Sequence, residues 1–253
     1  MLNIRTLSLL LLSSSSSLIA APIVLFDGTA GLPTAQGWSF LSLPSGAIQS
    51  SGPTSTNLNT TSSSGISAGY SILPPISVDL ALGINFRFDV RVNTETHLSN
   101  DRAGFSLILL GSNLSGIELG FWSNEIWAQN QNFTHGEGTA FSTNSMTTYD
   151  LFLDLTGYRL SANGQQILSG ALRNYSGQSS SPLAFVYSSP NFLFLGDDTT
   201  SASANIDFAR ASIEAVPEPS TFALLAPVLL ALAARRRCST AQPVLPENHD
   251  CNE

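Results

Sequence analysis

The stretch Ile84–Val92 reads INFRFDVRV, and it decides the fold class because apolar and polar residues alternate along its whole length. Successive side chains of a β-strand point to opposite faces, so this pattern predicts a strand with one face in a core and the other in solvent. The residues expected in the core are Ile84, Phe86, Phe88, Val90 and Val92, and those expected outside are Asn85, Arg87, Asp89 and Arg91.

Two further segments predict strands of the same kind. Tyr149–Leu155 (YDLFLDL) mostly repeats the alternation. Tyr158–Ser169 is expected to fold back on itself around Asn163 and Gly164. This dipeptide is the strongest short hairpin signal, because both residues accept positive φ.

Three other segments depart from simple alternation. Ala103–Leu110 (AGFSLILL) is apolar on both faces from Phe105 onward, which predicts a central strand covered on both sides. Ala204–Ala215 changes the parity of its apolar positions near Ala209, and a β-bulge explains that change. The Ser- and Thr-rich segment Ser50–Ser64 is expected to be a long loop.

The fold class follows from these segments together. Outside the two ends of the chain no stretch shows sustained helical spacing, and Gly, Pro, Ser and Asn gather between the short apolar runs. This pattern predicts an all-β domain at residues 22–214, an antiparallel two-sheet sandwich of jelly-roll type.

Composition excludes several classes of protein. Only 11% of the residues are charged, against about 25% in an average domain, and all ten basic residues are arginine. Residues 22–214 hold fourteen acids and six arginines, and this net charge of minus eight argues against nucleic acid as a partner. Cys238 and Cys251 both lie beyond this domain, so packing alone must hold it together.

The chain begins with the features of a secretory signal peptide. Arg5 precedes the apolar run Leu7–Leu12, and small residues follow at Ala20. We expect signal peptidase to remove residues 1–20. The serines Ser13–Ser17 dilute the apolar region, so an uncleaved membrane anchor stays open as an alternative.

A second apolar segment lies near the other end. Thr221–Ala234 is fourteen residues long, and as a helix it would span about 21 Å, less than the ~30 Å of a hydrocarbon core. Pro227 weakens such a helix further. The cluster Arg235, Arg236 and Arg237 follows at once and resists translocation, so we expect the C-terminus in the cytoplasm and the domain outside.

The order of these features resembles the PEP-CTERM sorting signal of Gram-negative bacteria. Val216-Pro217-Glu218-Pro219 comes first, then the short apolar helix at 221–234 and the arginine cluster at 235–237. The resemblance covers residues 215–237. It implies that an exosortase, a membrane transpeptidase, cleaves near the Pro-Glu-Pro block. The protein would then pass from transient inner-membrane attachment to the cell surface or the medium, in association with exopolysaccharide production.

Residues 238–253 extend past the point where such signals usually end, and we expect them to form a disordered polar tail. His249 with Cys238 and Cys251 suggests a metal site instead, but the spacing does not match a zinc module and leaves one ligand short.

The middle of the chain carries a second resemblance. LFDGTAGLPTAQGW from Leu25, HLSNDRAGFSLILLGSNLSGIELGFWSNEIWAQN from His97 and FLGDDTTSASANIDF from Phe194 resemble the bacterial choice-of-anchor domains, of the Y type. The resemblance spans residues 25–213 and implies a sandwich like those of concanavalin and laminin-G domains. It implies no catalytic residues.

The segment Gly116–Asn130 (GIELGFWSNEIWAQN) supplies the candidate site. With Ser123 and Asn124 as a two-residue loop it folds into a hairpin with one apolar face. Indole rings stack on the apolar side of a pyranose, and carboxylates and amides bond to its hydroxyls. The other face therefore predicts carbohydrate binding, by Trp122, Trp127, Glu118, Glu125 and Gln129, with Gly120 opening space opposite Trp127.

Alternatives stay open for this face. In one alternative, long loops cover the tryptophans, or the tryptophans belong to a second core layer. A glycosidase is the alternative function, because two carboxylates about 5 Å or about 6.5 to 9.5 Å apart cleave a glycosidic bond, although Glu118 and Glu125 are several ladder positions apart. His135 and Glu137 lie in the Gly-flanked stretch THGEGT, a loop expected either to close over the face or to be solvated.

Calcium is the one cofactor that the sequence suggests. Asp197 and Asp198 offer hard oxygen ligands, as do Asn100 and Asp101, but turn chemistry explains these residues equally well. His97 has no partner assignable from the sequence and is expected at the surface.

The sequence thus predicts an exported, surface-sorted protein with a non-catalytic role in the extracellular polysaccharide matrix. A carbohydrate-binding module requires Trp122 and Trp127 to be exposed together. A glycosidase requires a close carboxylate pair beside them, and a structural matrix protein requires neither.

Overall fold

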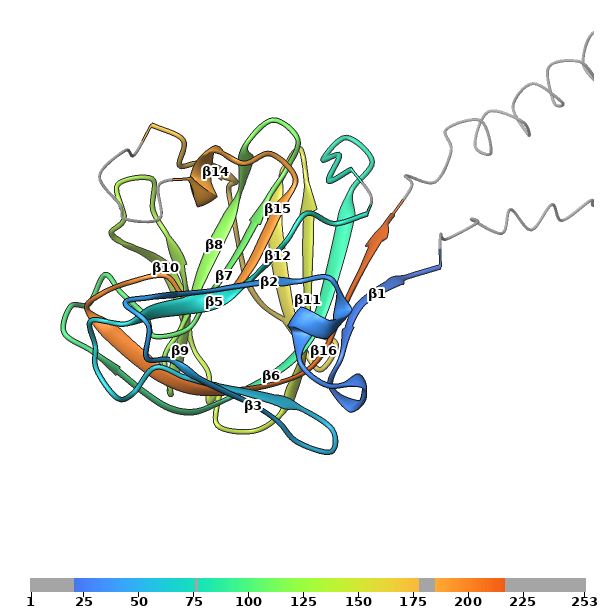
Figure 1. Ribbon diagram of the computed structural model, residues 1–253. Helices are drawn as coiled ribbons and strands as arrows, with labels where there is room; N and C mark the ends of the chain where they lie inside the picture. The colour runs from blue at the N-terminus through green and yellow to red at the C-terminus, as the bar shows by residue number, and fades with distance from the viewer. Residues whose placement is uncertain (1–20, 76, 178–184, 217–253) are drawn as a thin grey trace, which may run out of the picture. The chain divides into compact units, whose positions relative to one another are not determined.

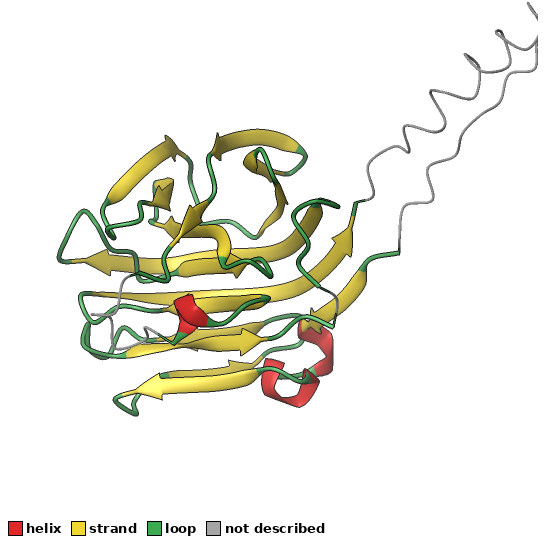
Figure 2. Cartoon of the chain, turned by 90° about the horizontal axis from the view of Figure 1, so that it is seen from above, coloured by secondary structure: helices red, strands yellow, loops and turns green. Residues whose placement is uncertain are grey.

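The computed structural model describes residues 21–75, 77–177 and 185–216, which form two antiparallel β-sheets (Figure 1 and Figure 2). Within these ranges there is no α-helix, and the helical elements are the 3₁₀ turns η1 (Gly28–Ala30), η2 (Pro33–Gln36) and η3 (Val186–Ser188). None of these is long and apolar enough to cross a membrane. The expected signal peptide, apolar helix, arginine cluster and tail lie outside the described residues. The prediction of an all-β sandwich is confirmed.

The first sheet contains the two longest strands. Its order is β13-β12-β11-β6-β16-β4-β3, and β1 pairs with the C-terminal half of β16. Its strands are β1 (Ile23–Asp27), β3 (Ile48–Ser51), β4 (Thr56–Asn59), β6 (Ile84–His97), β11 (Thr147–Asp154), β12 (Gly157–Ala162), β13 (Gln165–Gly170) and β16 (Ala202–Ala215).

The second sheet packs against the inner face of the first. Its order is β10-β9-β8-β7-β15-β5-β2, and the short β14 pairs with β8. Its strands are β2 (Ser39–Leu43), β5 (Ser67–Ile72), β7 (Ser106–Leu110), β8 (Ser115–Phe121), β9 (Glu125–Gln129), β10 (His135–Ala140), β14 (Arg173–Asn174) and β15 (Phe192–Asp197).

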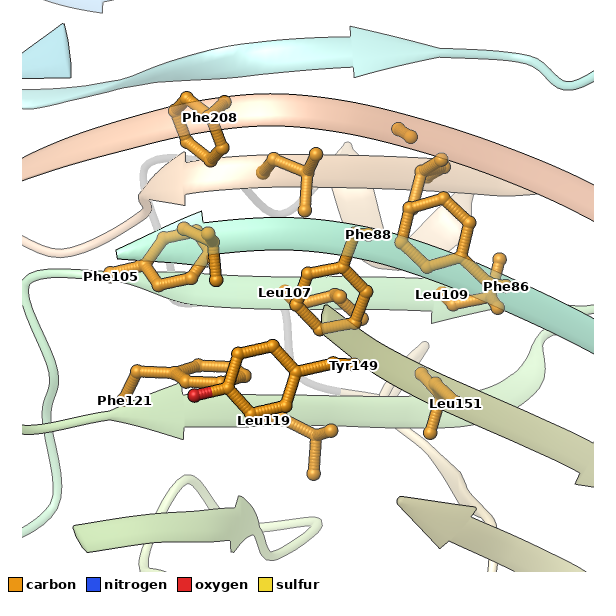
Figure 3. Packing of buried hydrophobic residues seen from close by; sticks show 14 of the residues in the cluster. Phe86, Phe88, Phe105, Leu107, Leu109, Leu119, Phe121, Tyr149, Leu151 and Phe208 are labelled. Carbon is orange, nitrogen blue, oxygen red and sulfur yellow. The ribbon is translucent and has the colours of Figure 1, made fainter. Parts of the chain in front are cut away.

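The apolar face of β6 forms the centre of the core (Figure 3). Its five apolar residues from Ile84 to Val92 are each at most 1% exposed, as the alternation predicts. The ring of Phe88 stacks on Tyr149 of β11 at 5.1 Å between centroids and meets Phe121 of the opposite sheet edge-on at 6.1 Å. Such aromatic pairs add to the free energy gained from burial alone, and here they join the two sheets.

The other strand predictions hold in detail. The hairpin of β12 and β13 turns at Asn163 and Gly164, both with positive φ (50° and 82°). All five residues of β7 are buried, as expected of a strand covered on both faces. The register of β16 against β6 shifts between Phe208 and Arg210, which confirms the predicted bulge.

The expectation of a long loop at Ser50–Ser64 is wrong. The segment contains the end of β3 and the whole of β4, where Thr56 and Leu58 face the core with no exposed surface. Composition alone suggested a loop, but threonine is β-branched and packs well on a pleated surface.

Two tyrosines of the core differ in the bonding of their hydroxyls. The hydroxyl of Tyr149 is buried and makes no hydrogen bond with a described residue. Thr147, which lies beside it in β11, donates its own hydroxyl to the Ser145 carbonyl at 3.0 Å. The hydroxyl of Tyr158 instead donates to Glu137 at 2.7 Å. A buried hydroxyl without a partner carries a desolvation penalty that a bonded hydroxyl does not.

We predict that Tyr149→Phe keeps or raises the free energy of unfolding, by up to about 1 kcal/mol, and that the matched variant Tyr158→Phe lowers it by about 1 to 2 kcal/mol. Urea denaturation followed by circular dichroism measures both. An equal loss of stability in the two variants would mean that the Tyr149 hydroxyl is bonded in solution.

Candidate functional site

The β8–β9 hairpin has the register that the sequence predicts. The amide of Trp122 donates to the Glu125 carbonyl at 2.9 Å across the two-residue loop, and Gly120 pairs with Trp127. An added Cβ at Gly120 would lie 2.7 Å from Cε2 of Trp127, so the indole occupies the space that the glycine leaves. One face of the hairpin joins the core, and the other belongs to the outer face of the second sheet.

The tryptophans on this outer face are not exposed, so the expectation that they are exposed together is wrong. Trp122 is 9% exposed and Trp127 is 1% exposed. The ring of His97 stacks on Trp122 at 4.1 Å between centroids, and the ring of His135 stacks on Trp127 at 4.3 Å. We call these four residues the indole–imidazole cluster. The indole nitrogen of Trp122 donates to the Arg102 carbonyl at 2.8 Å, which holds the preceding loop against the ring.

His97 is therefore no isolated surface residue, contrary to expectation. Its Nδ1 lies 3.1 Å from both carboxylate oxygens of Glu95, which also accepts from the Gly104 amide at 3.3 Å. Burial raises the pKa of the Glu95 carboxyl, although the hydrogen bond from His97 opposes that shift. The side chain of His97 is 28% exposed, so part of the ring reaches solvent.

His135 faces a hydrogen-bond acceptor with each ring nitrogen. Nδ1 lies 2.9 Å from the Asn100 carbonyl oxygen, and Nε2 lies 3.1 Å from Oε1 of Glu125. Both oxygens can accept, so each contact is a hydrogen bond when the facing ring nitrogen carries a proton. The two contacts fix the orientation of the ring, which lies stacked on the face of Trp127. The side chains of His135 and Glu125 are 23% and 30% exposed and form the rim of the cluster.

The stretch THGEGT falls in the edge strand β10 (His135–Ala140) rather than in a loop, and a register shift between His135 and Gly138 separates His135 from Glu137. Glu137 accepts from the Tyr158 hydroxyl in the first sheet and forms an ion pair with Arg173 of β14. Burial opposes ionisation, but the bonds from Arg173 and Tyr158 hold the pKa of Glu137 below its usual value. Glu137 thus ties β10 to the edge of the other sheet.

Glu118 and Gln129 lie farther along the same face, beneath a second layer of side chains. Ile108, Leu110, Phe192 and Phe194 of the sheet pack there against Tyr175, Val186 and Tyr187. Glu118 is 4% exposed and Gln129 is 2% exposed. The Tyr175 hydroxyl donates to the Gln129 carbonyl at 2.7 Å. Glu118 and Gln129 of the predicted set are therefore enclosed. The side chains that cover them are aromatic residues of an irregular segment, which gives no periodic signal in the sequence.

Glu118 shares a hydroxyl with a second carboxyl group. The oxygen of Tyr187 lies 2.7 Å from Oε2 of Glu118 and 2.9 Å from Oδ2 of Asp198. The single hydroxyl hydrogen serves only one of these contacts, so the other contact is a hydrogen bond when that carboxyl is protonated and donates to the hydroxyl oxygen. Burial and the nearby charge of Asp198 raise the pKa of Glu118, and burial also raises the pKa of Asp198.

This arrangement bears on the alternative of a glycosidase. Glu118 bonds to Tyr187 whereas Glu125 bonds to His135, so the two glutamates belong to separate networks. The carboxyl pair that does form, Glu118 with Asp198, is closed off by Tyr187, whereas a glycosidase needs carboxyls that flank a substrate bond. The described residues thus bring together no open carboxylate pair at the predicted face.

The calcium candidates Asp197 and Asp198 point to opposite sides of the second sheet. Asp197 accepts from the Thr60 hydroxyl at 2.8 Å and from the Thr199 amide at 3.1 Å, whereas Asp198 bonds to Tyr187. Asp101 of the other candidate pair accepts from the His135 amide at 2.8 Å. Among the described residues, no group of three or more His, Cys, Asp or Glu side chains is placed to hold a metal ion.

Asp197 makes stability depend on pH. Burial raises its pKa to about 9, although the bonds from Thr60 and Thr199 oppose the shift. In the unfolded chain an aspartate ionises near pH ~4. The stability that the protonated group contributes is therefore complete below about pH 4 and is lost as the pH rises toward 9.

We predict that Asp197→Asn, which resembles the protonated acid, raises the free energy of unfolding at pH 8 by on the order of 2 kcal/mol. It should also flatten the pH dependence of that free energy between about pH 4 and pH 9. Chemical denaturation at a series of pH values measures both effects. Asp150→Asn, which removes a surface partner of Arg87, is the control and should leave the slope in place. A slope unchanged in Asp197→Asn would contradict the prediction.

Comparison with known proteins supports the sorting signal. Residues 215–237 match the sequence model of the PEP-CTERM protein-sorting motif, which confirms the predicted position of this signal. Its first residues are still part of the sandwich, because Ala215 ends β16 and the Val216 amide donates to the Gly83 carbonyl at 2.9 Å. Pro217, Glu218, Pro219 and the arginine cluster lie outside the described residues. No curated protein sequence matches the chain.

Several solved structures are similar to the sandwich. A carbohydrate esterase from the Shiga toxin-encoding bacteriophage phi24B matches at 14% identity with a TM-score of 0.54, covering 77% of this chain and 99% of that one. A protein with a galectin-like fold from Bacillus subtilis matches at 10% identity with a TM-score of 0.49, covering 77% and 96%. The carbohydrate recognition domain of Emp46p matches at 7% identity with a TM-score of 0.43, covering 75% and 94%. At such identities the likeness shows the fold alone, a two-sheet β-sandwich.

Proposed function

We propose that this protein is exported after signal peptidase removes residues 1–20 and that an exosortase-type transpeptidase then processes it at residues 215–237. The observation that carries the proposal is the match of these residues to the sorting motif, directly after the last strand of the sandwich. The mature protein would reside at the surface of a Gram-negative bacterium or in its surrounding matrix. The resemblance of its sandwich to choice-of-anchor domains agrees with this role.

We also propose that the protein has a non-catalytic role in the extracellular polysaccharide matrix and binds carbohydrate there. The support comes from the rim of the indole–imidazole cluster, where His97, His135 and Glu125 are each partly exposed. Because the indoles are covered, the flat imidazole rings above them serve as the stacking surfaces. Glu125 offers an acceptor for sugar hydroxyls. Trp122 and Trp127 lie beneath as a rigid support, which limits the entropy lost on binding.

The sorting role is tested in the native host. We predict that replacing Arg235, Arg236 and Arg237 together by alanine removes most of the protein from the cell surface, because the cluster is expected to fix the orientation of the apolar segment. Fractionation and immunoblotting measure the distribution, and a strain without its exosortase should show the same change. A triple variant still processed and placed like the wild type would contradict the proposal.

The carbohydrate role is tested by tryptophan fluorescence of the mature protein during titration with the host's own exopolysaccharide. A Trp38→Phe background removes the core indole, whose nitrogen donates to the Leu25 carbonyl at 2.8 Å. We predict a saturable shift that weakens about tenfold in Glu125→Gln and His135→Ala, since each loses a charged hydrogen bond of ~1.5 to 3 kcal/mol. A flat titration of the folded protein would leave a purely structural role in the matrix.

A further inference from the structure

A hollow of about 110 Å³ opens on the outer face of the first sheet, where β1, β16 and β6 lie side by side (Figure 1). Ser212 of β16 pairs with Arg87 of β6 on one side, and Ile213 pairs with Ile23 of β1 on the other. We call this place the β1–β16 hollow. It is lined by Pro22, Asn85, Arg87, Arg210, Ser212, Ile213 and Glu214.

Hydrogen bonds with Asp150 and within the lining hold the polar side chains of the hollow, and these bonds leave some polar atoms unused. Arg87 binds Asp150 through Nε at 2.7 Å and through one terminal nitrogen at 3.1 Å, so its Nη1 takes no part in that pair. Asn85 donates to Oε1 of Glu214 at 3.1 Å, a bond that uses neither the Asn85 carbonyl oxygen nor Oε2 of Glu214. The hollow therefore presents one held donor and two held acceptors within a small space.

Pro22 and Ile213 supply the apolar part of the lining, beside the polar Arg210 and Ser212. Pro22 is exposed and precedes β1, and Ile213 belongs to the core beneath. A surface that combines held donors, held acceptors and aliphatic carbon suits a sugar ring, whose hydroxyls and C–H groups need all three. The volume is below the ~300 Å³ of the smallest drug-sized pockets, so it takes one ring rather than an oligosaccharide.

The charge around the hollow favours neutral sugars over acidic ones. The hollow and its surroundings carry more carboxylates than guanidinium groups, namely Asp27, Asp89, Asp150 and Glu214 against Arg87 and Arg210. The domain as a whole carries the net charge of minus eight derived from its sequence. Long-range repulsion therefore acts against an acidic polysaccharide and leaves a neutral one unaffected.

The hollow is complete in the mature protein. All of its lining residues lie between Pro22 and Glu214, so cleavage after Ala20 and near Pro217 would remove none of them. If signal peptidase acts after Ala20, Pro22 becomes the second residue of the mature chain. The hollow then lies beside both processed ends.

We propose that the β1–β16 hollow binds one sugar unit of a neutral polysaccharide. This site lies on the opposite sheet from the indole–imidazole cluster, and it rests on the proposed carbohydrate function for the class of its ligand. A protein with both sites would contact polysaccharide from its two outer faces and act as a cross-link in the matrix. The hydroxyls bind to Arg87, Asn85 and Glu214, and the ring packs on Pro22.

The test is isothermal titration calorimetry of the mature protein with neutral oligosaccharides prepared from the host's exopolysaccharide, compared with oligogalacturonate of the same length. We expect saturable binding of the neutral probe and at least tenfold weaker binding of the acidic one. Ser212→Leu fills the hollow and, measured in the His135→Ala background so that the cluster does not mask the loss, should weaken neutral binding at least tenfold. Arg210→Ala, at an exposed position, should weaken it about threefold even if Ser212→Leu misfolds.

Controls separate this site from the cluster. Arg159→Ala changes the same sheet face two strands away, where Arg159 lies 4.4 Å above the Phe152 ring, and should bind like the wild type. Neutral binding that persists in weakened form in His135→Ala and falls further when Ser212→Leu or Arg210→Ala is added supports the hollow. Binding kept in both hollow variants but lost in His135→Ala overturns this proposal and leaves the proposed function standing. No binding of the neutral probe to the folded wild type overturns the hollow, as does tighter binding of the acidic probe.

Discussion

The antiparallel pairing of β6 with β16 is the constraint on which the rest of the structure depends. The two fourteen-residue strands pair from Ile84 with Ala215 to His97 with Ala202. Their inner residues supply the centre of the core. Three strands of the first sheet pair directly with one of the two, β11 with β6 and both β4 and β1 with β16. The other three are attached through these, β12 and β13 beyond β11 and β3 beyond β4. The bulge at Phe208–Arg210 bends β16, which pairs with β4 before the bulge and with β1 after it.

The second sheet is covered on its outer face as well as its inner one. Aromatic side chains of the segment after β13 lie over β7, β8 and β15, and histidines lie over the tryptophans of the β8–β9 hairpin. Polar groups there form close contacts: His135 with Glu125 at the partly exposed rim, and Glu118 and Asp198 with the hydroxyl of Tyr187 in the buried part. Low dielectric makes such networks rigid when they are fully bonded. The exposed surface is therefore a narrow rim of imidazole and carboxylate rather than a wide aromatic platform.

The two ends of the sandwich leave from neighbouring strands. Ile23 pairs with Ile213, so the strand that begins three residues after the expected signal peptide lies beside the strand that runs into the sorting motif. Val216 is still hydrogen-bonded to the domain, and Pro217 follows at once. An enzyme that cuts at the Pro-Glu-Pro block would act within a few residues of the folded strand. Each of those residues spans at most about 3.5 Å of extended chain. The same strands frame the β1–β16 hollow, so any ligand held there lies next to the point of processing.

The sequence by itself determined the elements whose signal is local. Alternation in Ile84–Val92 fixed a strand and its faces, Asn163-Gly164 fixed a hairpin, the change of period near Ala209 fixed a bulge, and the segment at 215–237 fixed the sorting signal. It also gave the register of the β8–β9 hairpin, because a two-residue loop leaves one pairing. What covers that hairpin was decided only by the tertiary structure. His97 and Tyr187 reach Trp122 and Glu118 from distant parts of the chain, and His135 reaches Trp127 from the neighbouring strand β10, at a register shift. Burial of the candidate residues depends on those long-range contacts, and no periodicity within one segment encodes them.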